Sequence, residues 1–337
     1  MQDLPTVTLV FLVFNRREEL RTSLTEMLER LDYPSELVDV IVVDNASEDD
    51  SSAMVREEFP QVQLIRREEN VGTSGWNDGF AVAKGELVMA LDDDCYLPGD
   101  GLRRAVEAMR EQRADLVSFG VTRHVDPEFR FNDKYRTGLL SFWGCAVLMR
   151  HEVLDALGGF DPEIFVWAHE LEFMIRFFDH GFRHLHAPDI IAVHMKDGEV
   201  KHWSTYYDER AHVVNSRHFA YVAAKLMRPR DAFGALIALS TATIRTALRV
   251  NRAAIRGLIP TFKGFAHGLR HREPVRNPEV SRVYRHNFHS FASWWWLSRS
   301  LGDVVRRRPG GRYDAYYAER ARYYPTTESV LEISSQA

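Results

Sequence analysis

The chain has 337 residues, of which 45% are hydrophobic and 12% aromatic, so it can bury a full core and is not mainly disordered. Its two cysteines, Cys95 and Cys145, lack the spacing of a disulfide framework or a zinc site. Met1-Gln2-Asp3 is not followed by the basic and apolar segments of a secretory signal. The longest uncharged runs, such as 232–244, have 13 residues, fewer than the roughly 20 needed to span a bilayer. We therefore expect a cytoplasmic protein, either soluble or peripheral on the inner face of the cell membrane.

The net charge of -5 conceals an asymmetry along the chain. Residues 1–195 carry 19 Lys and Arg against 36 Asp and Glu, whereas residues 196–337 carry 24 against 12. An acidic front can gather cations, and a basic tail can face something anionic. No nucleic-acid-reading module accompanies the basic residues, so nucleic acid is not expected as the partner.

The first half alternates β-branched runs with segments of helical period, the pattern of a mostly parallel sheet covered by helices. We expect strands at 7–14, 38–43, 62–65 and 86–91, and helices at 16–31, before residue 85 and at 101–112. Ligands bind beyond the carboxyl ends of the strands in such sheets. Asn15, Asp44 and Asp92 fall at these ends, so we expect them to converge on one crevice.

The second half mixes the two kinds of element. Strands are expected at 116–119 and 142–150, helices at 151–157 and 169–180, and helices without a clear strand from about residue 205.

Three carboxylates, Asp92, Asp93 and Asp94, follow the fourth expected strand. An isolated acidic run is usually a solvated turn. At the end of a strand, however, alternate residues of an extended chain point to one side, so Asp92 and Asp94 can share one hard cation. Asp93 then points the other way, to backbone or to nucleotide. A third ligand is offered by His194, although a lone histidine ending an apolar run is more often structural.

Two further segments carry candidate polar residues. The turn Asn70-Val-Gly72 to Gly79 has three glycines and includes Asn77, but it has neither dinucleotide-fold nor P-loop spacing. It suits either an ordinary turn or a backbone passing close to a ligand. In Trp167-Ala-His169-Glu170-Leu-Glu172, both glutamates suit a helix start. We expect Glu172 to pair with Arg176, and Glu170 to be the better candidate for a base.

Taken in order, these segments resemble the inverting glycosyltransferases of family 2. The segments are Asn15-Arg16, Asp44-Asn45-Ala-Ser47, residues 70–79, Asp92-Asp-Asp94, Gly158-Gly-Phe-Asp161, His169-Glu170 and Val193-His194, and the match covers about residues 6–195. The resemblance implies an α/β GT-A fold, a Rossmann-like mixed sheet flanked by helices, with a helical C-terminal extension. It places the catalytic domain at 1–225 and a helical, basic region at 226–337.

The resemblance also implies site roles. Asn15 and Asp44 match residues around the nucleotide base and ribose, and Asn70, Gly72 and Asn77 match the diphosphate-side loop, with Asp93 a further donor contact. Asp92, Asp94 and His194 match a site for Mn²⁺ or Mg²⁺. Trp143, Gly144, Trp167 and His169 fall where sugar or acceptor is contacted. Members commonly have Glu-Asp where this chain has His169-Glu170, so Glu170 takes the place of the usual aspartate base.

The implied reaction is transfer of galactofuranose, rhamnose or a similar sugar from a UDP- or dTDP-linked donor to a carbohydrate or lipid-linked acceptor, with inversion. Bacterial galactofuranosyl- and rhamnosyltransferases of polysaccharide or cell-wall synthesis look most similar. A sugar nucleotidyltransferase and a non-catalytic nucleotide-sugar-binding module remain alternatives. The sequence is also compatible with a homo-oligomer.

The tail repeats arginine at steps of four, three and four: Arg245, Arg249, Arg252 and Arg256. On one helix these residues share a face that can rest on an anionic membrane. A solvated helix packing on the catalytic domain explains the pattern equally well. Trp294-Trp-Trp296 is either an interfacial aromatic patch or a core cluster.

Overall fold

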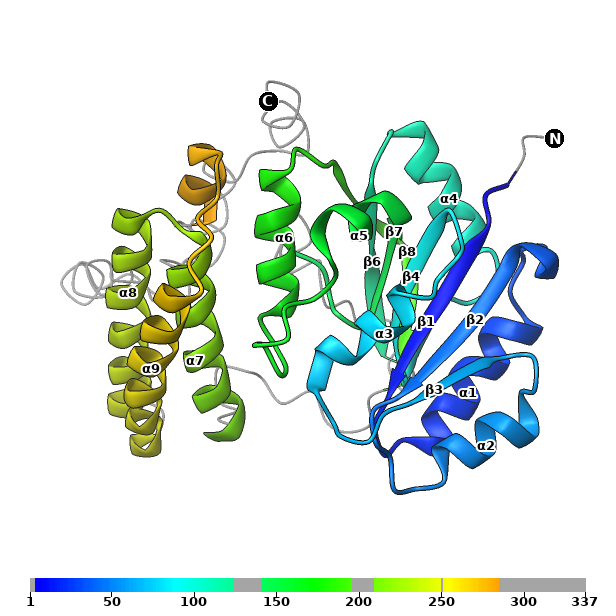
Figure 1. Cartoon of the computed structure of the whole chain (residues 1–337), viewed down its shortest axis with the longest axis horizontal. Coiled ribbons are helices and arrows are strands. Elements are labelled where there is room, and N and C mark those ends of the chain that lie inside the picture. Colours follow the sequence, from blue (N-terminus) through cyan, green and yellow to red (C-terminus); the bar gives the residue numbers. More distant parts are fainter. Residues whose placement is uncertain (1–3, 124–140, 196–208, 250, 285–337) are drawn as a thin grey trace, which may run out of the picture. The chain divides into compact units, whose positions relative to one another are not determined.

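The computed structural model describes residues 4–123, 141–195, 209–249 and 251–284, and Figure 1 shows its elements. The chain divides into two units, one of residues 1–177 and 182–199, the other of residues 178–181 and 200–337. Trp294 to Trp296 lie outside the described residues.

The first unit is built on a mixed sheet. Its strands are β1 (Val7–Val13), β2 (Val38–Asp44), β3 (Gln63–Arg66), β4 (Leu87–Asp92), β5 (Cys95–Tyr96), β6 (Leu116–Arg123), β7 (Ala146–Arg150) and β8 (His184–His194). Their order within the described residues is β3-β2-β1-β4-β7-β6-β8-β5. β1, β2, β3 and β4 pair in parallel, whereas β7 pairs antiparallel with both β4 and β6. The expected mixed sheet is therefore confirmed.

Helices cover both faces of the sheet because its parallel strands are apolar on both sides and almost entirely buried. One face packs α1 (Arg17–Glu29), α2 (Ser51–Glu58) and α4 (Gly101–Glu111) against β1 residues such as Leu9 and Phe11. The opposite face of β1 and β2 contacts the short helix α3 (Trp76–Phe80). α5 (His151–Leu157) contacts β7, and α6 (His169–Asp179) begins with His169-Glu170.

The parallel strands end together at one edge of the sheet, which carries polar residues. β1 and β4 run in register, so Leu12 lies beside Asp92 and Val13 beside Asp44 of β2. The chain turns at Asn15 with φ 54°, a left-handed conformation that asparagine tolerates. The register therefore places the ends of β1, β2 and β4 side by side.

The second unit is helical. It contains α7 (Glu209–Leu226), α8 (Pro229–Arg249), the 3₁₀ helix η4 (Arg252–Gly257) and α9 (Leu258–Arg270). α9 packs closely on α7 because Gly264 and Gly268 have no side chain: a Cβ on either would lie 2.1 Å from the Arg217 carbonyl oxygen or 2.3 Å from that of Tyr221. No helix among the described residues is both long and apolar enough to traverse a bilayer.

The expected four-arginine face does not lie on one continuous helix. α8 ends at Arg249, and Asn251 starts η4 by accepting a hydrogen bond from the Ala253 backbone N–H at 2.9 Å. The break puts Arg252 and Arg256 on a separate element from Arg245, and Arg256 pairs with Glu209.

Candidate active site

An acidic centre forms where β4, β5 and β8 meet. Asp92 is the last residue of β4, and β5 pairs antiparallel with β8 so that Cys95 lies opposite His194. The Met195 N–H donates to the Asp94 carbonyl oxygen at 2.7 Å, which fixes this pairing. His194 Nε2 then lies 3.0 Å from Asp94 Oδ1 and 4.0 Å from Asp92 Oδ2. The structure therefore brings together all three residues expected to hold a metal.

The charges of this centre are mutually dependent. Burial raises the pKa of Asp92 to about 6, and the neighbouring Asp94 carboxylate adds to that rise. Burial lowers the pKa of His194, but its hydrogen bond to Asp94 and the surrounding negative charge raise it to about 9. The two carboxylates thus favour the charged form of His194.

The donor set suits a hard divalent cation. Asp92, Asp94 and His194 each offer one ligand atom, and these atoms all lie within 4.8 Å of one another. Two carboxylates and one imidazole are compatible with Mn²⁺ or Mg²⁺, which keep further positions for other oxygen ligands. Burial, and after it the Asp94 carboxylate, raise the pKa of Asp92, and a bound cation would favour its charged form.

Asp93 points away from this centre, as expected from alternation. Its Oδ2 accepts a hydrogen bond from the Phe14 N–H at 3.2 Å, and its carbonyl oxygen accepts one from the Ser23 hydroxyl at 2.9 Å. The side chain thereby ties the acidic turn to the turn after β1. Of the two contacts expected for Asp93, the structure shows the one to backbone.

Arg16 joins the acidic centre, and the sequence reasoning missed it as a site residue. Its guanidinium donates to Asp94 Oδ2 and lies 3.4 Å from Asp93 Oδ1. Burial disfavours its charge, but Asp93, Asp94 and Asp92 outweigh that effect and raise the pKa of Arg16. Its place directly after Asn15, at the end of a strand, was the available signal.

The side chain of Asp44 is fully buried at the end of β2. Its carboxylate accepts from the Ser47 N–H at 2.7 Å and from the Ser52 hydroxyl. Asn15 meets the same loop, because its Oδ1 accepts from the Glu48 N–H at 2.7 Å. Asn15 and Asp44 thus both accept hydrogen bonds from the segment that follows β2.

Beside this loop, residues 46–48 and 66–68 line an open depression of about 540 Å³. It lies at the carboxyl ends of β2 and β3. Arg66 spans its two walls by donating to the Ser47 carbonyl oxygen at 3.2 Å.

The glycine-rich turn is held by Asn45, a second residue that the sequence reasoning left out of the site. Asn45 Nδ2 donates to Asn70 Oδ1 at 2.9 Å and to the Gly72 carbonyl oxygen at 3.0 Å. Asn45 Oδ1 accepts from the Val71 N–H at 3.1 Å. Asn70 is thereby placed next to Asn45 rather than isolated on the turn.

Gly72 is required by close backbone packing. Its φ is 67°, and a Cβ there would lie 1.8 Å from the Phe165 carbonyl oxygen. The same oxygen accepts from the Thr73 N–H at 2.8 Å. The glycine-rich turn therefore lies directly against the segment that precedes His169-Glu170.

Asn77 is occupied by backbone. Its Nδ2 donates to the Phe160 carbonyl oxygen and its Oδ1 accepts from the Phe160 N–H, both at 2.8 Å. The structure places Asn77 as a clamp on the Gly158–Phe160 turn.

The start of α6 brings His169 and Glu170 together with Gly144. His169 Nδ1 lies 3.2 Å from Glu170 Oε2. Burial lowers the pKa of His169, so its imidazole is neutral between Trp76, stacked at 6.0 Å, and Phe160, edge-on at 5.1 Å. A Cβ on Gly144 would meet Glu170 Oε1 at 2.8 Å and His169 Nε2 at 2.9 Å.

The backbone before α6 is strained: Trp167 and Ala168 are consecutive non-glycine residues with φ of 56° and 64°. Trp167 and Trp143, expected near the sugar or acceptor, are 38% and 36% exposed. Both rings are therefore partly accessible for stacking.

Glu172 is structural, as expected. It is fully buried, and Arg176 binds it with two hydrogen bonds of 2.8 and 2.6 Å. Arg176 also donates to the carbonyl oxygens of Leu157 and Gly159. The pair anchors α6 and, through it, the position of Glu170.

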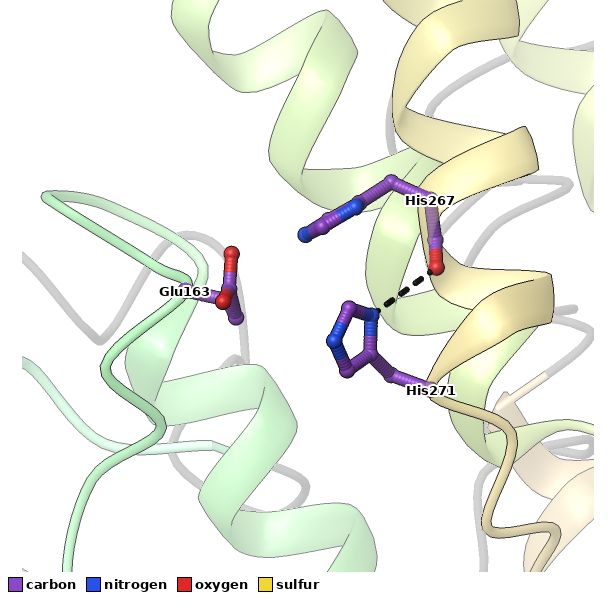
Figure 2. Close-up of side chains that lie close together, drawn as sticks. All are labelled: Glu163, His267 and His271. Atoms are coloured by element: carbon purple, nitrogen blue, oxygen red, sulfur yellow. Dashed lines mark hydrogen bonds between the residues drawn. The ribbon is translucent and has the colours of Figure 1, made fainter.

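The second unit has a histidine pair at the end of α9, where His271 directly follows the helix. His271 Nδ1 donates to the His267 carbonyl oxygen at 3.2 Å (Figure 2). The imidazole centroids lie 4.4 Å apart, and the His267 ring lies 5.3 Å from that of Tyr221 on α7. The pair packs α9 on α7. Glu163, also drawn in Figure 2, belongs to the first unit.

The sheet order and the polar strand ends define a GT-A-like fold. A mannosyltransferase from Pyrobaculum calidifontis, solved with GDP-Man and Mn²⁺, aligns with 99% of this chain and 85% of its own, with a TM-score of 0.53 and 19% identity. TarS residues 1–349 from S. aureus, solved with UDP-GlcNAc, aligns with 84% of this chain and 92% of its own, with a TM-score of 0.53 and 17% identity. These similarities establish the fold.

Sequence comparison agrees with this fold: residues 8–167 match the model of glycosyl transferase family 2. A beta-monoglucosyldiacylglycerol synthase from Synechocystis sp. is 27% identical over 203 residues, 53% of this chain and 41% of that protein. An undecaprenyl-phosphate 4-deoxy-4-formamido-L-arabinose transferase from Aeromonas hydrophila is 29% identical over 170 residues, 46% of this chain and 52% of that protein. The chain thus spans about half or less of these relatives.

Proposed function

We propose that this chain transfers a sugar from a nucleoside-diphosphate donor to an acceptor hydroxyl, with inversion at the anomeric carbon and dependence on a divalent cation. The observation that carries the proposal is the convergence of Asp92, Asp94 and His194 on one position at the sheet edge. Nucleotide sugars in the two solved neighbours, and Mn²⁺ in one, support the donor class and the cation.

In this proposal, Asp92, Asp94 and His194 hold Mn²⁺ or Mg²⁺. The bound cation would offset the negative charge of the diphosphate as it leaves. The depression beside Asp44 and Asn15 receives the nucleoside, with Arg66 in its wall. Asn70 and Gly72 place the glycine-rich turn on the diphosphate side, and Asn45 holds that turn in place.

Glu170 is the general base. Its carboxylate takes the proton of the attacking hydroxyl, and its negative charge contributes to raising the pKa of Asp92, so it lies near the metal centre. The neutral His169 imidazole occupies the place of the usual acidic neighbour and lies 3.2 Å from Glu170 without adding a charge. Trp143 and Trp167 offer exposed rings for the sugar or acceptor.

For the donor we propose a class of compound: UDP- or dTDP-linked galactofuranose, rhamnose or a similar sugar. Relatives whose names include diacylglycerol and undecaprenyl phosphate favour a lipid-linked acceptor over a free sugar. We propose residues 1–225 as the catalytic domain and residues 226–337 as its helical extension.

The test is a panel of nucleotide sugars, each assayed with and without Mn²⁺ for thermal stabilisation and for release of nucleoside diphosphate. We expect Glu170→Gln to retain divalent-dependent stabilisation by donor but to lose about 10²-fold to 10⁴-fold in kcat. Release of pyrophosphate instead would indicate a nucleotidyltransferase. A Glu170→Gln variant that binds donor and turns over at the wild-type rate would remove Glu170 as the base.

We also propose that the second unit binds an anionic lipid bilayer. Phe233, Ile237, Ile244 and Leu248 of α8 are exposed and share one helical face. On α9, the apolar residues Ile259, Phe262 and Leu269 are exposed, and the exposed basic residues Lys263 and Arg270 each follow one of them in the chain. Residues 209–284 carry 14 Lys and Arg against 4 Asp and Glu, so the charge complements anionic headgroups.

Flotation with phosphatidylcholine vesicles, with and without phosphatidylglycerol, tests this surface. We expect binding only to the anionic vesicles, and its loss in Phe233→Ser/Leu248→Ser but not in Val82→Ser, a control at an exposed apolar residue of the first unit. Equal flotation of all three proteins would contradict the proposal. Self-association that the double substitution abolishes, without flotation, would show that the surface binds a second copy instead.

A further inference from the structure

Arg16 supplies a positive charge to the acidic centre. Its guanidinium contacts both Asp94 and Asp93. Asp94 is almost fully buried, with a side chain 3% exposed, whereas the Arg16 side chain is 43% exposed. The carboxylates are thus held by the fold, and the guanidinium is the partner with room to move.

The backbone explains why these carboxylates cannot follow Arg16. Asp93 is held by the Phe14 N–H and the Ser23 hydroxyl, and Asp94 by the Met195 N–H on its carbonyl oxygen. Arg16 itself precedes α1, with its carbonyl oxygen accepting from the Leu20 N–H at 3.0 Å. Its long side chain can therefore leave the acidic centre without unfolding α1.

Both oxygens of Asp94 have contacts in this arrangement. Oδ1 lies 3.0 Å from His194 Nε2, and Oδ2 accepts from Arg16. A divalent cation arriving at Asp92, Asp94 and His194 meets a guanidinium already neutralising Asp94. The two cations repel each other and compete for the same carboxylate.

We propose that Arg16 is the resident counter-cation of Asp94. The Arg16 guanidinium weakens binding of the divalent cation alone, and it leaves Asp94 when the cation binds together with a diphosphate. The inference rests on the proposed function, because the diphosphate is the anion that Arg16 turns to. An arginine suits that role since its planar guanidinium can bind phosphate oxygens in pairs. Metal and diphosphate then bind together more tightly than either binds alone.

Titration calorimetry with MnCl₂ on the full chain, with and without UDP, tests the proposal without any turnover. Arg16→Gln removes the guanidinium, and Arg17→Gln is the matched control, because the Arg17 side chain pairs with the exposed Glu18 instead. We expect Arg16→Gln to bind Mn²⁺ alone about tenfold or more tightly than the wild type. We expect UDP to improve Mn²⁺ affinity severalfold less in Arg16→Gln than in the wild type and in Arg17→Gln.

Weaker or unchanged Mn²⁺ binding by Arg16→Gln would overturn the proposal. Weaker binding would show that Arg16 instead positions Asp94 for the metal. An unchanged effect of UDP in Arg16→Gln would overturn the release step. Circular dichroism of each variant shows whether it is folded. Arg16→Lys keeps the positive charge, so its Mn²⁺ affinity should stay near that of the wild type. Tighter Mn²⁺ binding by Arg16→Gln in a protein that hydrolyses no nucleotide sugar would refute the proposed function and leave the competition intact.

Discussion

Replacing Gly144 by alanine should disable the proposed base without displacing the donor. The new Cβ would lie 2.8 Å from Glu170 Oε1 and 2.9 Å from His169 Nε2, where ordinary contacts begin at 3.4 Å. His169 cannot withdraw, because it is buried between Trp76 and Phe160. The Glu170 carboxylate, 19% exposed, must therefore retreat by about 0.6 Å.

A misplacement of about 1 Å costs on the order of 10²-fold in rate, so we expect kcat to fall about tenfold in Gly144→Ala. The donor KM should stay within twofold, since the depression beside Asp44 is formed by other residues. Steady-state kinetics with the donor that the panel identifies gives both values. Gly158→Ala is the control: φ there is 72°, but a Cβ would meet nothing within 4 Å. A kcat for Gly144→Ala equal to that of Gly158→Ala would refute the reasoning.

Three further predictions follow from contacts in the same unit. Glu172→Gln should lower the free energy of unfolding by about 2–4 kcal/mol, because it leaves the Arg176 guanidinium without a carboxylate partner. Calorimetry measures this change. Glu18→Gln, which breaks an exposed ion pair, is the control and should change the free energy of unfolding little. Mn²⁺ affinity should rise about tenfold per pH unit between pH 7 and 9 and then level off, because the metal binds neutral His194, whose pKa is about 9. An Mn²⁺ affinity that does not change with pH over this range would contradict the prediction. Asn45→Ala should raise the donor KM about tenfold with a smaller effect on kcat, since it frees the glycine-rich turn; an unchanged KM would show that the turn holds without it.

The parallel part of the sheet could be predicted because each of its strands is a local apolar run followed by a polar residue. Asp44 and Asp92 end β2 and β4, as expected. The helix expected before residue 85 ends at Phe80 instead, although turns continue to Ala83, whose N–H donates to the Gly79 carbonyl oxygen at 3.0 Å. Local pattern does not show where a regular helix gives way to turns.

Long-range pairing explains what the sequence could not show. The two-residue strand β5 exists only because β8 lies beside it, and that pairing brings His194 to Asp94. Arg16 and Asn45 were visible as residues, but their partners lie 78 and 25 positions away in the chain. The break between α8 and η4 depends on the cap at Asn251, which the regular spacing of the arginines concealed.

The contact of Gly72 and Thr73 with the Phe165 carbonyl oxygen has a consequence for engineering donor preference. The glycine-rich turn is thus hydrogen-bonded to the backbone just before the strained residues Trp167 and Ala168. Grafting residues 70–79 from a related enzyme would therefore transfer the turn without the segment around Phe165 on which it packs. A chimaera that carries residues 160–168 from the same source keeps both segments matched, and it should retain turnover where the single graft loses it.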